Sequence, residues 1–459
     1  MTQAEIKQLI QKQRTFFHSD ATLDVEYRIH ALQKLKACIL KYENEINIAI
    51  RADLGKCAFE SYMCETGLVL SELTYMLKHT RKFSKERTVR TPLAQFHSRS
   101  YQKPSPYGVT LIMSPWNYPF MLTIEPLIDA LAAGNTAILK PSAYSAHTTA
   151  LISRMIQECF DEKYVAVVTG GREENNFLLN EHFDYIFFTG SQEVGKEVMR
   201  HASNHLTPIT LELGGKSPCI VHKSADIRLA AKRIVFGKFL NCGQTCVAPD
   251  YIYCDRTVKD KLIKELKKQI QKQFSKQPLA HKEYGKIINL KHFDRLLGLI
   301  DYDKVVYGGT FDHHTLQIEP TIMDNVTFAD AVMQEEIFGP VLPILTYDSI
   351  SEAVNNIRAM SHPLALYIFA GDTHVAGNVI ARIGFGGGCI NDTLIHLATS
   401  EMPFGGFGES GMGSYHGKTG FDTFTHYKSI VDKKTWLDLP IRYQPYKKIN
   451  NKLLHMFLK

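Results

Sequence analysis

The sequence predicts an α/β protein whose largest part is a doubly wound parallel sheet, with helices on both of its faces. From Gly108 onward, short apolar runs alternate with helix-length segments. Runs such as 109–113 and 185–188 are apolar almost throughout, which is typical of parallel strands that are covered on both sides. The chain of 459 residues is too long for one ordinary domain, so two or three domains are expected.

The N-terminal part, to about residue 90, is expected to be helical. Apolar residues recur at three- and four-residue steps between 29 and 39, and a second stretch of this kind runs from about 65 to 82. The polar segment 97–104, with an aromatic residue inside it, instead predicts a strand or ribbon that lies outside the core.

The elements of the central and C-terminal parts follow from the same patterns. Strands are expected at 109–113, 137–139, 164–168, 185–188 and 209–211, and helices at 119–133, 145–160 and 192–204. A second α/β region is expected from Gly214 to about 395, with helices at 226–240, 257–275 and 351–359. The segment 403–413 is rich in glycine, which favours a loop.

The composition is that of a soluble globular protein, with 44% hydrophobic and 22% charged residues. No apolar run approaches the ~18–20 residues of a membrane span, and the N-terminus lacks the pattern of a secretory signal. Nine cysteines in such a chain predict reduced thiols and a cytoplasmic protein. The net charge of +6 is a small excess, and no binding to nucleic acid is expected.

The C-terminal tail, with the residues just before it, is the clearest basic segment of the chain. One interpretation is contact with an anionic surface or an acidic partner. The other is a solvated chain end, which is the usual behaviour of termini. The charged residues of this segment are Lys433, Lys434, Arg442, Lys447, Lys448, Lys452 and Lys459, against Asp432 and Asp438.

Cys246 is a candidate nucleophile, in a Gly-Gln-Thr-Cys-Val-Ala-Pro stretch that begins at Gly243. Glycine permits backbone angles that other residues resist, so the loop can turn sharply and present a side chain. A thiolate is a strong nucleophile, although an unperturbed thiol is ionised only to about a few per cent at neutral pH. The alternative is a small buried apolar residue, the usual role of a cysteine in a long chain.

Glu212 and Asn117 are candidates because each comes at or just after the end of a predicted strand. Ligands bind at strand ends in doubly wound sheets. A carboxylate among apolar neighbours has a raised pKa and is a better general base, and an asparagine held between prolines can aim its amide at a developing oxyanion. The alternatives are a surface glutamate and a turn asparagine that bonds its own backbone.

A phosphate-bearing ligand is suggested by the turn at Gly190 and Ser191, which leads from a strand into a helix that contains Gly195. The free N–H groups and the dipole of a helix N-terminus both favour an anion. The familiar Gly-x-Gly-x-x-Gly pattern is absent, so an ordinary strand-to-helix turn is the alternative. Lys140 ends another strand and could reach a ribose or phosphate, or could be a solvated surface lysine.

Glu336 and Phe338 lie together in a Glu-Glu-Ile-Phe-Gly-Pro stretch. The acid could bind a ribose hydroxyl, and the aromatic ring could pack against a nicotinamide. The alternative is a plain turn with a core phenylalanine.

Together these segments resemble the aldehyde dehydrogenase superfamily, from about residue 105 to 430. Five motifs appear in the order of that family: Pro-Trp-Asn-Tyr-Pro, Phe-Thr-Gly-Ser, Glu-Leu-Gly-Gly-Lys, Gly-Gln-Thr-Cys and Glu-Ile-Phe-Gly-Pro. The Pro-Phe-Gly-Gly at 403–406, the segment 410–417, the residues around Cys246 and the short N-terminus resemble the class 3 branch. Chance agreement of five motifs is implausible, so the resemblance favours the functional interpretation of each residue.

The resemblance implies a fold in three parts. A doubly wound parallel-sheet cofactor domain would comprise 1–86 and 107–213, and a second α/β catalytic domain 214–395. A small β-ribbon of 87–106 and 415–440 would pair two subunits into a homodimer, and the tail 441–459 would follow it.

The resemblance also implies oxidation of an aldehyde to a carboxylic acid. Cys246 would attack the aldehyde carbonyl and form a thiohemiacetal. The amide of Asn117 and the backbone N–H of Cys246 would hold its oxyanion, and hydride transfer would leave a thioester. Glu212 would then activate the water that releases the acid. Class 3 relatives favour medium- or long-chain aliphatic or aromatic aldehydes.

The implied cofactor is NAD or NADP, and no metal is implied. Glu336 and Phe338 would position the nicotinamide riboside, and Lys140 the adenosine ribose. Ala143 departs from the NAD-preferring relatives, which often carry a glutamate three residues after the lysine that matches Lys140. A carboxylate there would repel a 2′-phosphate and alanine does not, so we expect NADP to be accepted alongside NAD.

Some alternatives remain open. Cys242, four residues before Cys246, is either a structural thiol or a partner in a reversible protective disulfide. An acylating enzyme of the same fold would pass the thioester to coenzyme A, but such relatives typically lack a base at the position of Glu212. A non-catalytic scaffold or binding protein is disfavoured by the intact Cys246, Glu212 and Asn117.

Overall fold

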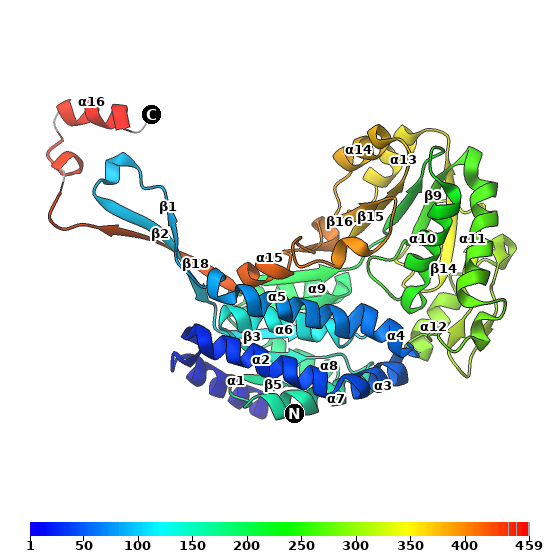
Figure 1. Cartoon of the computed structure of the whole chain (residues 1–459), viewed down its shortest axis with the longest axis horizontal. Coiled ribbons are helices and arrows are strands. Elements are labelled where there is room, and N and C mark those ends of the chain that lie inside the picture. The colour runs from blue at the N-terminus through cyan, green and yellow to red at the C-terminus, as the bar shows by residue number, and fades with distance from the viewer. Residues whose placement is uncertain (439, 447, 458–459) are drawn as a thin grey trace.

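The computed structural model describes residues 1–438, 440–446 and 448–457 (Figure 1). Two sheets with helices on their faces form the body, and a three-stranded ribbon projects from one end of it (Figure 1). The fold is α/β with two mainly parallel sheets, as the sequence predicts. Within the basic tail, Lys447 and Lys459 lie outside the described residues.

The first sheet has six strands in the order β17-β7-β6-β3-β4-β5. Neighbouring strands are parallel, except that β17 runs antiparallel to β7. The chain winds outward from β3 in both directions, so the strand order switches between β3 and β6, which is where open α/β sheets bind ligands. The strands are β3 (Val109–Met113), β4 (Thr136–Lys140), β5 (Val165–Val167), β6 (Tyr185–Gly190), β7 (Ile209–Leu213) and β17 (Gly411–Met412).

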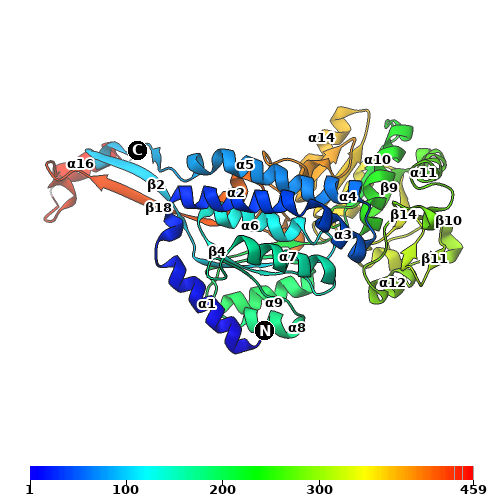
Figure 2. The same cartoon turned by 60° about the horizontal axis from the view of Figure 1, so that its bottom comes forward.

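Both faces of this sheet are covered because successive side chains of a strand point to opposite sides. Ile112 and Leu139 join one hydrophobic cluster with α2, α5, α6 and α7, whereas Leu111 and Ile138 join another with α1, α8 and α9. Figure 2 shows α2 and α5 on one side of the body and α1, α8 and α9 on the other. These helices are α1 (Gln3–Phe17), α2 (Val25–Lys41), α5 (Gly67–Phe83), α6 (Met121–Ala133), α7 (Ala146–Cys159), α8 (Arg172–Leu179) and α9 (Gln192–Ser203).

The second sheet has seven strands in the order β10-β13-β14-β9-β8-β15-β16, and only β10 is antiparallel to its neighbour. Ile252 and Ile344 cluster with α10 and α11, and Tyr253 and Leu345 cluster with α12, α13 and α14. The strands are β8 (Pro218–Val221), β9 (Tyr251–Asp255), β10 (Val305–Tyr307), β13 (Thr321–Met323), β14 (Val341–Tyr347), β15 (Ala365–Phe369) and β16 (Gly387–Ile390). The helices are α10 (Ile227–Phe239), α11 (Lys259–Phe274), α12 (Leu290–Leu297), α13 (Ile350–Arg358) and α14 (Thr373–Arg382).

Short elements connect these layers. One of them, α3 (Glu43–Leu54), ends at Gly55, which takes the left-handed φ of 71° that glycine tolerates after a helix. The others are α4 (Ala58–Ser61), a π-helical turn (Tyr62–Thr66), β11 (Phe311–Asp312), β12 (Gln317–Ile318) and α15 (Gly417–Thr423). None of the described helices is both long and apolar enough to cross a bilayer.

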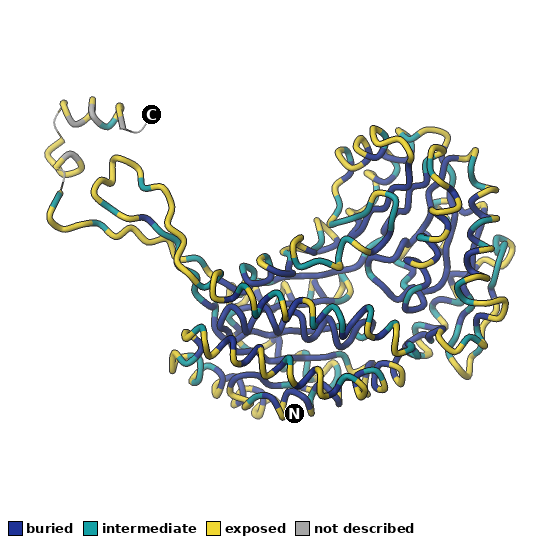
Figure 3. Tube along the Cα trace, in the orientation of Figure 1, coloured by how far each residue is buried: buried dark blue, intermediate teal, exposed yellow. Residues whose placement is uncertain are grey.

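The ribbon consists of β1 (Arg87–Val89), β2 (Ser98–Pro106) and β18 (Thr425–Lys433). The strands β2 and β18 pair antiparallel along their whole length, from Pro106 opposite Thr425 to Ser98 opposite Lys433. Figure 3 shows that most of the ribbon is exposed, and α16 (Lys448–Phe457) lies at its outer end. The polar strand expected at 97–104 is therefore present, and it lies outside the core.

The glycine-rich segment 403–413 is more ordered than the expected loop. A 3₁₀ turn (Gly408–Ser410) leads into β17, where Gly411 pairs with Glu212 of β7. Gly411 has a φ of 148°, and a Cβ at this position would lie 2.2 Å from the carbonyl oxygen of Leu211. Glycine here permits close pairing with a strand edge, a role that cannot be distinguished by composition from that of a flexible loop.

Candidate active site

Four of the candidate residues lie at the carboxyl edge of the first sheet. Lys140 ends β4, Gly190 ends β6, Glu212 is the penultimate residue of β7, and Asn117 follows β3 by four residues. These strands are parallel neighbours, so their carboxyl ends meet at one edge. Cys246 reaches this region from the other sheet unit, because its loop connects α10 to β9.

The loop before Cys246 has an unusual backbone. Asn241, Cys242 and Gly243 all have positive φ angles, of 52°, 53° and 74°. A Cβ on Gly243 would lie 2.2 Å from the carbonyl oxygen of Gly339, so only glycine fits. The expected sharp turn is present, and it presents Cys246 toward a cavity.

Gln244 holds this loop in place from inside. Its side-chain amide donates to the carbonyls of Asn241 (3.1 Å) and Lys286 (3.0 Å), and its Oε1 accepts from the N–H of Ile288 at 3.0 Å. Gln244 is fully buried. Its three bonds hold the loop both to Asn241 and to the segment 286–288, which lies between α11 and α12.

Asn117 is buried beside the same loop. Its Nδ2 donates to the carbonyl of Gln244 at 3.0 Å, and its own carbonyl accepts from Asn241 Nδ2 at 2.8 Å. The Asn117 side chain therefore donates to the loop before Cys246 and not to its own turn. A carboxamide has two N–H groups, so one remains to donate to an oxygen atom beside Cys246.

A buried ion pair supports this arrangement. Lys56 Nζ lies 2.8 Å from Glu65 Oε1 and donates to the carbonyl of Asn117 at 3.0 Å. Glu60 accepts from the backbone N–H of Asn241 at 2.8 Å. No sequence pattern singled out these three residues, because charged side chains in a helical segment are normally solvated.

The thiol of Cys246 is partly exposed in the cavity. Burial, with the nearby carboxyl groups of Glu336 and Glu212, raises the pKa of this thiol to about 12. In the protein without ligands the thiol is therefore protonated at neutral pH, and its reactivity depends on the charges around it.

Glu212 is buried, with 3% of its surface exposed, and neither carboxyl oxygen has a hydrogen-bond partner among the described residues. Burial raises the pKa of Glu212 well above its ordinary value. Such a carboxyl group is a strong base once it is ionised, and its charge contributes to the raised pKa of Cys246.

Glu336 and Phe338 come from the loop that precedes β14. Glu336 packs over Gly214, where a Cβ would lie 2.0 Å from Glu336 Oε2, and Glu336 Oε1 is buried without a partner in the described ranges. Burial, followed by the charge of Asp250, raises the pKa of Glu336 to about 8. Phe338 packs edge-to-face against Trp116, with ring centres 5.4 Å apart.

The turn into α9 has the geometry of a capped helix start. Ser191 is the N-cap residue and its Oγ accepts from Val194 N at 3.4 Å, while Gly190 is half-buried at the end of β6. A Cβ on Gly195 would lie 2.7 Å from Leu213 Cδ2, so glycine allows α9 to approach β7 closely.

Lys140 is buried, and its Nζ donates to the carbonyls of Pro141 (3.1 Å) and Gly170 (2.8 Å). Burial lowers the pKa of Lys140 to about 8. Lys140 is therefore not a solvated surface lysine, which was the alternative interpretation of the sequence. One of its three donors remains for another group.

Cys242 points away from the cavity. Burial raises the pKa of Cys242, which lies against Tyr284, and a Cβ on Gly285 would be 3.3 Å from its sulfur. All nine cysteines are free. This packing favours the structural interpretation of Cys242 over a protective disulfide with Cys246.

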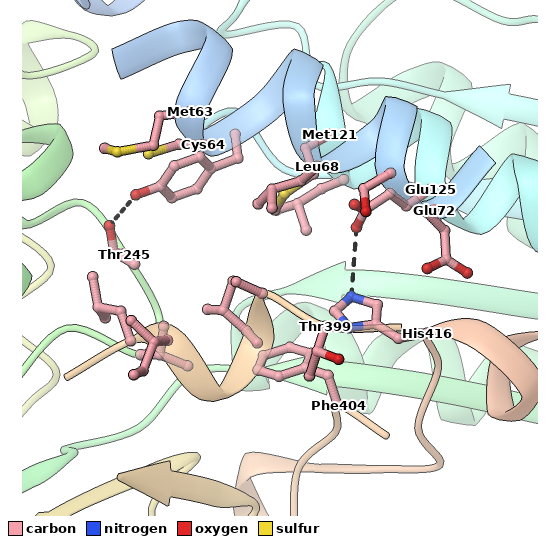
Figure 4. Close-up of a pocket in the computed structure, with 18 of the residues that line it drawn as sticks. Met63, Cys64, Leu68, Glu72, Met121, Glu125, Thr245, Thr399, Phe404 and His416 are labelled. Carbon is pink, nitrogen blue, oxygen red and sulfur yellow. Dashed lines mark hydrogen bonds and ion pairs between the residues drawn. The ribbon is translucent and has the colours of Figure 1, made fainter. Parts of the chain in front are cut away.

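An apolar cavity of about 200 Å³ leads to Cys246. Figure 4 shows Leu68 and Met121 on one wall and Phe404 opposite them, with Thr245 at one end. Thr245 Oγ1 and the Tyr118 hydroxyl lie 2.7 Å apart. Tyr118, Thr245 and Phe404 lie in motifs that the sequence shows, whereas no pattern in the sequence singled out Leu68 or Met121.

A thiol, a carboxamide and a buried carboxyl group that has no partner among the described residues lie at the carboxyl edge of a doubly wound sheet, which is the arrangement of an enzyme with a dinucleotide cofactor. Residues 1–430 match the model of the Aldehyde dehydrogenase family, and the chain belongs to this family. As a member it oxidises aldehydes to carboxylic acids and depends on NAD or NADP.

The similarity to individual members extends over nearly the whole chain. The chain is 48% identical to the 4,4'-diaponeurosporen-aldehyde dehydrogenase of Staphylococcus aureus, over 96% of this chain and 97% of that protein. It is 42% identical to the dimeric, NADP-preferring aldehyde dehydrogenase of Canis lupus familiaris, over 96% and 98%.

Two solved structures are similar as well. The substrate-bound Staphylococcus aureus AldH has a TM-score of 0.97 at 47% identity and covers 99% of both chains. The NAD-dependent aldehyde dehydrogenase of Sinorhizobium meliloti has a TM-score of 0.87 at 26% identity, over 95% of this chain and 88% of that chain. Neither the coenzyme A-acylating alternative nor the non-catalytic scaffold finds support in these relatives.

Proposed function

We propose that Cys246 is the nucleophile of this aldehyde oxidation, with Asn117 and Glu212 as its partners. The observation that supports this most directly is the position of the thiol in an apolar cavity, with the Asn117 amide bonded to its loop and the carboxyl group of Glu212 nearby. The thiolate attacks the aldehyde carbon and forms a thiohemiacetal. Its oxyanion accepts hydrogen bonds from Asn117 Nδ2 and from the backbone N–H of Cys246.

The second half of the reaction is hydrolysis. The cofactor, when bound, would supply the hydride acceptor, and Cys246 would hold the acyl group as a thioester once the hydride has left the thiohemiacetal carbon. Glu212 takes a proton from the attacking water, the carboxylic acid leaves, and the Cys246 thiolate is restored. Glu212 has no hydrogen-bond partner among the described residues, and its burial disfavours the ionised form and raises its pKa, which suits this role.

The residues proposed to hold the cofactor fit such a group. Glu336 Oε1 is a buried acceptor without a partner in the part of the chain described, and it suits a ribose hydroxyl. Phe338 supplies an aromatic face for the nicotinamide ring. At the other end of the site, Gly190, Ser191 and Gly195 form a close-packed helix start for the pyrophosphate, and Lys140 would meet the adenosine ribose.

NADP is proposed to be accepted alongside NAD. Ala143 is exposed just after β4 and carries no charge that would repel a 2′-phosphate. The Canis lupus familiaris relative is described as NADP-preferring, which agrees with this proposal.

The substrate is proposed to be a medium- or long-chain aliphatic or an aromatic aldehyde. The walls of the cavity are apolar, and they favour a hydrocarbon chain over a small polar aldehyde. The aldehyde in the name of the Staphylococcus aureus relative is 4,4'-diaponeurosporenal.

Three further proposals concern organisation. The ribbon 87–106 and 415–440 would pair two chains into a homodimer, as the name of the dimeric relative suggests, because most of it is exposed on a single chain. The proposed division into 1–86 with 107–213, and 214–395, assigns most strands of one sheet to each part, although β17 of the first sheet comes from residues 411–412. A cytoplasmic location agrees with nine free cysteines.

The test is to follow the absorbance of reduced nicotinamide across an aldehyde panel, once with NAD and once with NADP. We expect turnover with both cofactors, and a higher kcat/KM for longer or aromatic aldehydes. Folded protein that turned over no aldehyde would defeat the proposed chemistry. A more than hundredfold preference for NAD in kcat/KM would defeat the proposal for Ala143 alone.

A further inference from the structure

The cavity at Cys246 has a second, polar end that the chemistry at the thiol does not use. Figure 4 shows Glu72, Glu125 and His416 together at the end away from Thr245, with apolar side chains in between. All three line the cavity, although only 3%, 3% and 7% of their surfaces are exposed. The group lies where α5 and α6 meet the segment that leads into α15.

Two atoms at this end face each other without a proper hydrogen bond. Glu125 Oε2 and His416 Nε2 are 3.5 Å apart, beyond the usual N–H···O range, and neither has another partner in the described part of the chain. A buried polar atom that is left unsatisfied destabilises the fold. Such a pair in a cavity wall therefore points to a ligand group that satisfies both atoms.

The residues around this pair show what kind of group fits. Glu72 is already occupied, because its Oε1 accepts from the N–H of Gly417 at 2.7 Å. Burial and the neighbouring carboxyl groups of Glu72 and Glu125 raise the pKa of Asp129, which lies behind them, well above its ordinary value. Burial also raises the pKa of Glu125. Since burial favours the neutral form of Glu125 and Asp129, the unpaired Glu125 Oε2 and His416 Nε2 suit a neutral polar group better than a cation.

We propose that this end of the cavity binds a hydroxyl group on the aldehyde substrate, placed at a distance from the carbonyl, which bridges Glu125 and His416. A hydroxyl both donates and accepts, so one group can satisfy a carboxyl oxygen and an imidazole nitrogen. An ammonium group only donates, and its transfer between apolar walls is expensive. The inference rests on the proposed function, because it assigns the far end of a substrate whose carbonyl lies at Cys246.

The experiment compares three aldehyde series of matched length, each long enough to avoid cyclisation: alkanals, ω-hydroxyalkanals and ω-trimethylammonio-alkanals. The last series carries a positive charge without a donor, so it separates charge from hydrogen bonding. At the length that spans the cavity, we expect kcat/KM for the hydroxyaldehyde to exceed that for the alkanal about tenfold. Glu125→Leu should reduce this ratio to about one, whereas Met121→Leu, one turn away on α6, should keep the wild-type ratio whatever its overall rate.

Three results would overturn the assignment: no preference for the hydroxyl at any length in the wild-type enzyme, an unchanged preference in Glu125→Leu, or a larger preference for the cation. A binding measurement needs no variant, so it serves even if Glu125→Leu does not fold. The α,ω-alkanediols should compete with the aldehyde more strongly than 1-alkanols of equal length, and equal inhibition would contradict the proposal. Oxidation of alkanals without a hydroxyl preference defeats this inference alone, and failure to oxidise any aldehyde defeats the proposed function with it.

Discussion

The two sides of the candidate active site differ in how their polar groups are bonded. On the side of the thiol loop, the amides of Asn117, Asn241 and Gln244 all donate to backbone carbonyls. On the opposite side, Glu212 has no partner on either oxygen and Glu336 has none on Oε1, within the residues that the structure describes. The protein itself bonds the amide donors of the first side, whereas the carboxyl oxygens of the second side are available to ligands.

This difference separates positioning from reactivity. Gln244 fixes the loop at little cost, because both ends of its side-chain amide are bonded, whereas the amides of Asn117 and Asn241 donate but leave their side-chain oxygens without a partner among the described residues. A buried carboxyl group without a partner destabilises the fold and gains a raised pKa, which makes it a better base. Substitutions on the two sides should therefore have opposite effects on stability.

The largest effect is expected at the thiol, where the two sides meet. Cys246→Ser should lower kcat/KM by at least about a thousandfold, because a hydroxyl group at this position is a far weaker nucleophile than a thiolate. The measurement is the initial rate of cofactor reduction over a range of aldehyde concentrations, which gives kcat/KM. Cys389→Ser alters another partly exposed thiol and should stay within about twofold of wild type. Equal losses in both variants would remove Cys246 from its proposed role.

On the unbonded side, Glu212→Gln should slow hydrolysis more than hydride transfer. We expect a rapid burst of reduced cofactor followed by steady turnover about a hundredfold below wild type, because the thioester accumulates when its base is lost. Stopped-flow absorbance resolves the two phases. Glu336→Gln should instead lower the burst rate itself, since Glu336 is proposed to hold the cofactor. Full steady-state activity in Glu212→Gln would mean that another group is the base.

The sequence predicted the backbone elements of the site but not which of its side chains are hydrogen-bonded. The strands at 109–113 and 185–188 and the turn at Gly243 were predictable, because apolar runs and glycine have local causes. The five motifs identified the residues, but not their state of bonding. The backbone of Glu212 pairs with Gly411 of β17, a segment distant in the chain, so no local pattern shows what surrounds its carboxyl group.

Some residues of the site could not be predicted from the sequence because they meet only through long-range contacts. Lys56 and Glu65 form a buried pair behind Asn117, although their helical segment carries no sign of chemistry. The polar end of the cavity combines Glu125 of α6 with His416, almost three hundred residues later. No local pattern encodes such a meeting, because each residue alone has the appearance of an ordinary polar side chain.

Stability tests the comparison more directly than activity. Gln244→Leu removes three buried hydrogen bonds and should lower the free energy of unfolding by about 2–3 kcal/mol. Glu212→Leu replaces a partnerless buried carboxyl group with an apolar one of similar size and should raise it by about 1 kcal/mol. Thermal unfolding midpoints should therefore move in opposite directions. A loss of stability in both variants would mean that Glu212 is held by interactions that its geometry does not reveal.

The smallest effect concerns the charge of Glu336 at the thiol. Its pKa is raised to about 8, so below this pH it is mostly protonated and exerts little repulsion on a thiolate. Above pH 8 it is ionised and contributes to the raised pKa of Cys246, which is about 12. The rate of Cys246 alkylation by iodoacetamide in the enzyme without cofactor should therefore rise with pH in both forms, and more steeply in Glu336→Gln.

The variant and the wild type should react at similar rates near pH 6.5, and the variant should be a few-fold faster near pH 9.5, since removing a neighbouring negative charge lowers the pKa of a thiol. Glu335→Gln alters the adjacent glutamate, which pairs with Arg295, and should match wild type at both pH values. Mass spectrometry of the labelled peptide confines the measurement to Cys246. An enhancement of equal size at both pH values would show that Glu336 influences the thiol by packing and not by its charge. Glu212 would then be the one carboxyl group of the two whose charge still acts on Cys246.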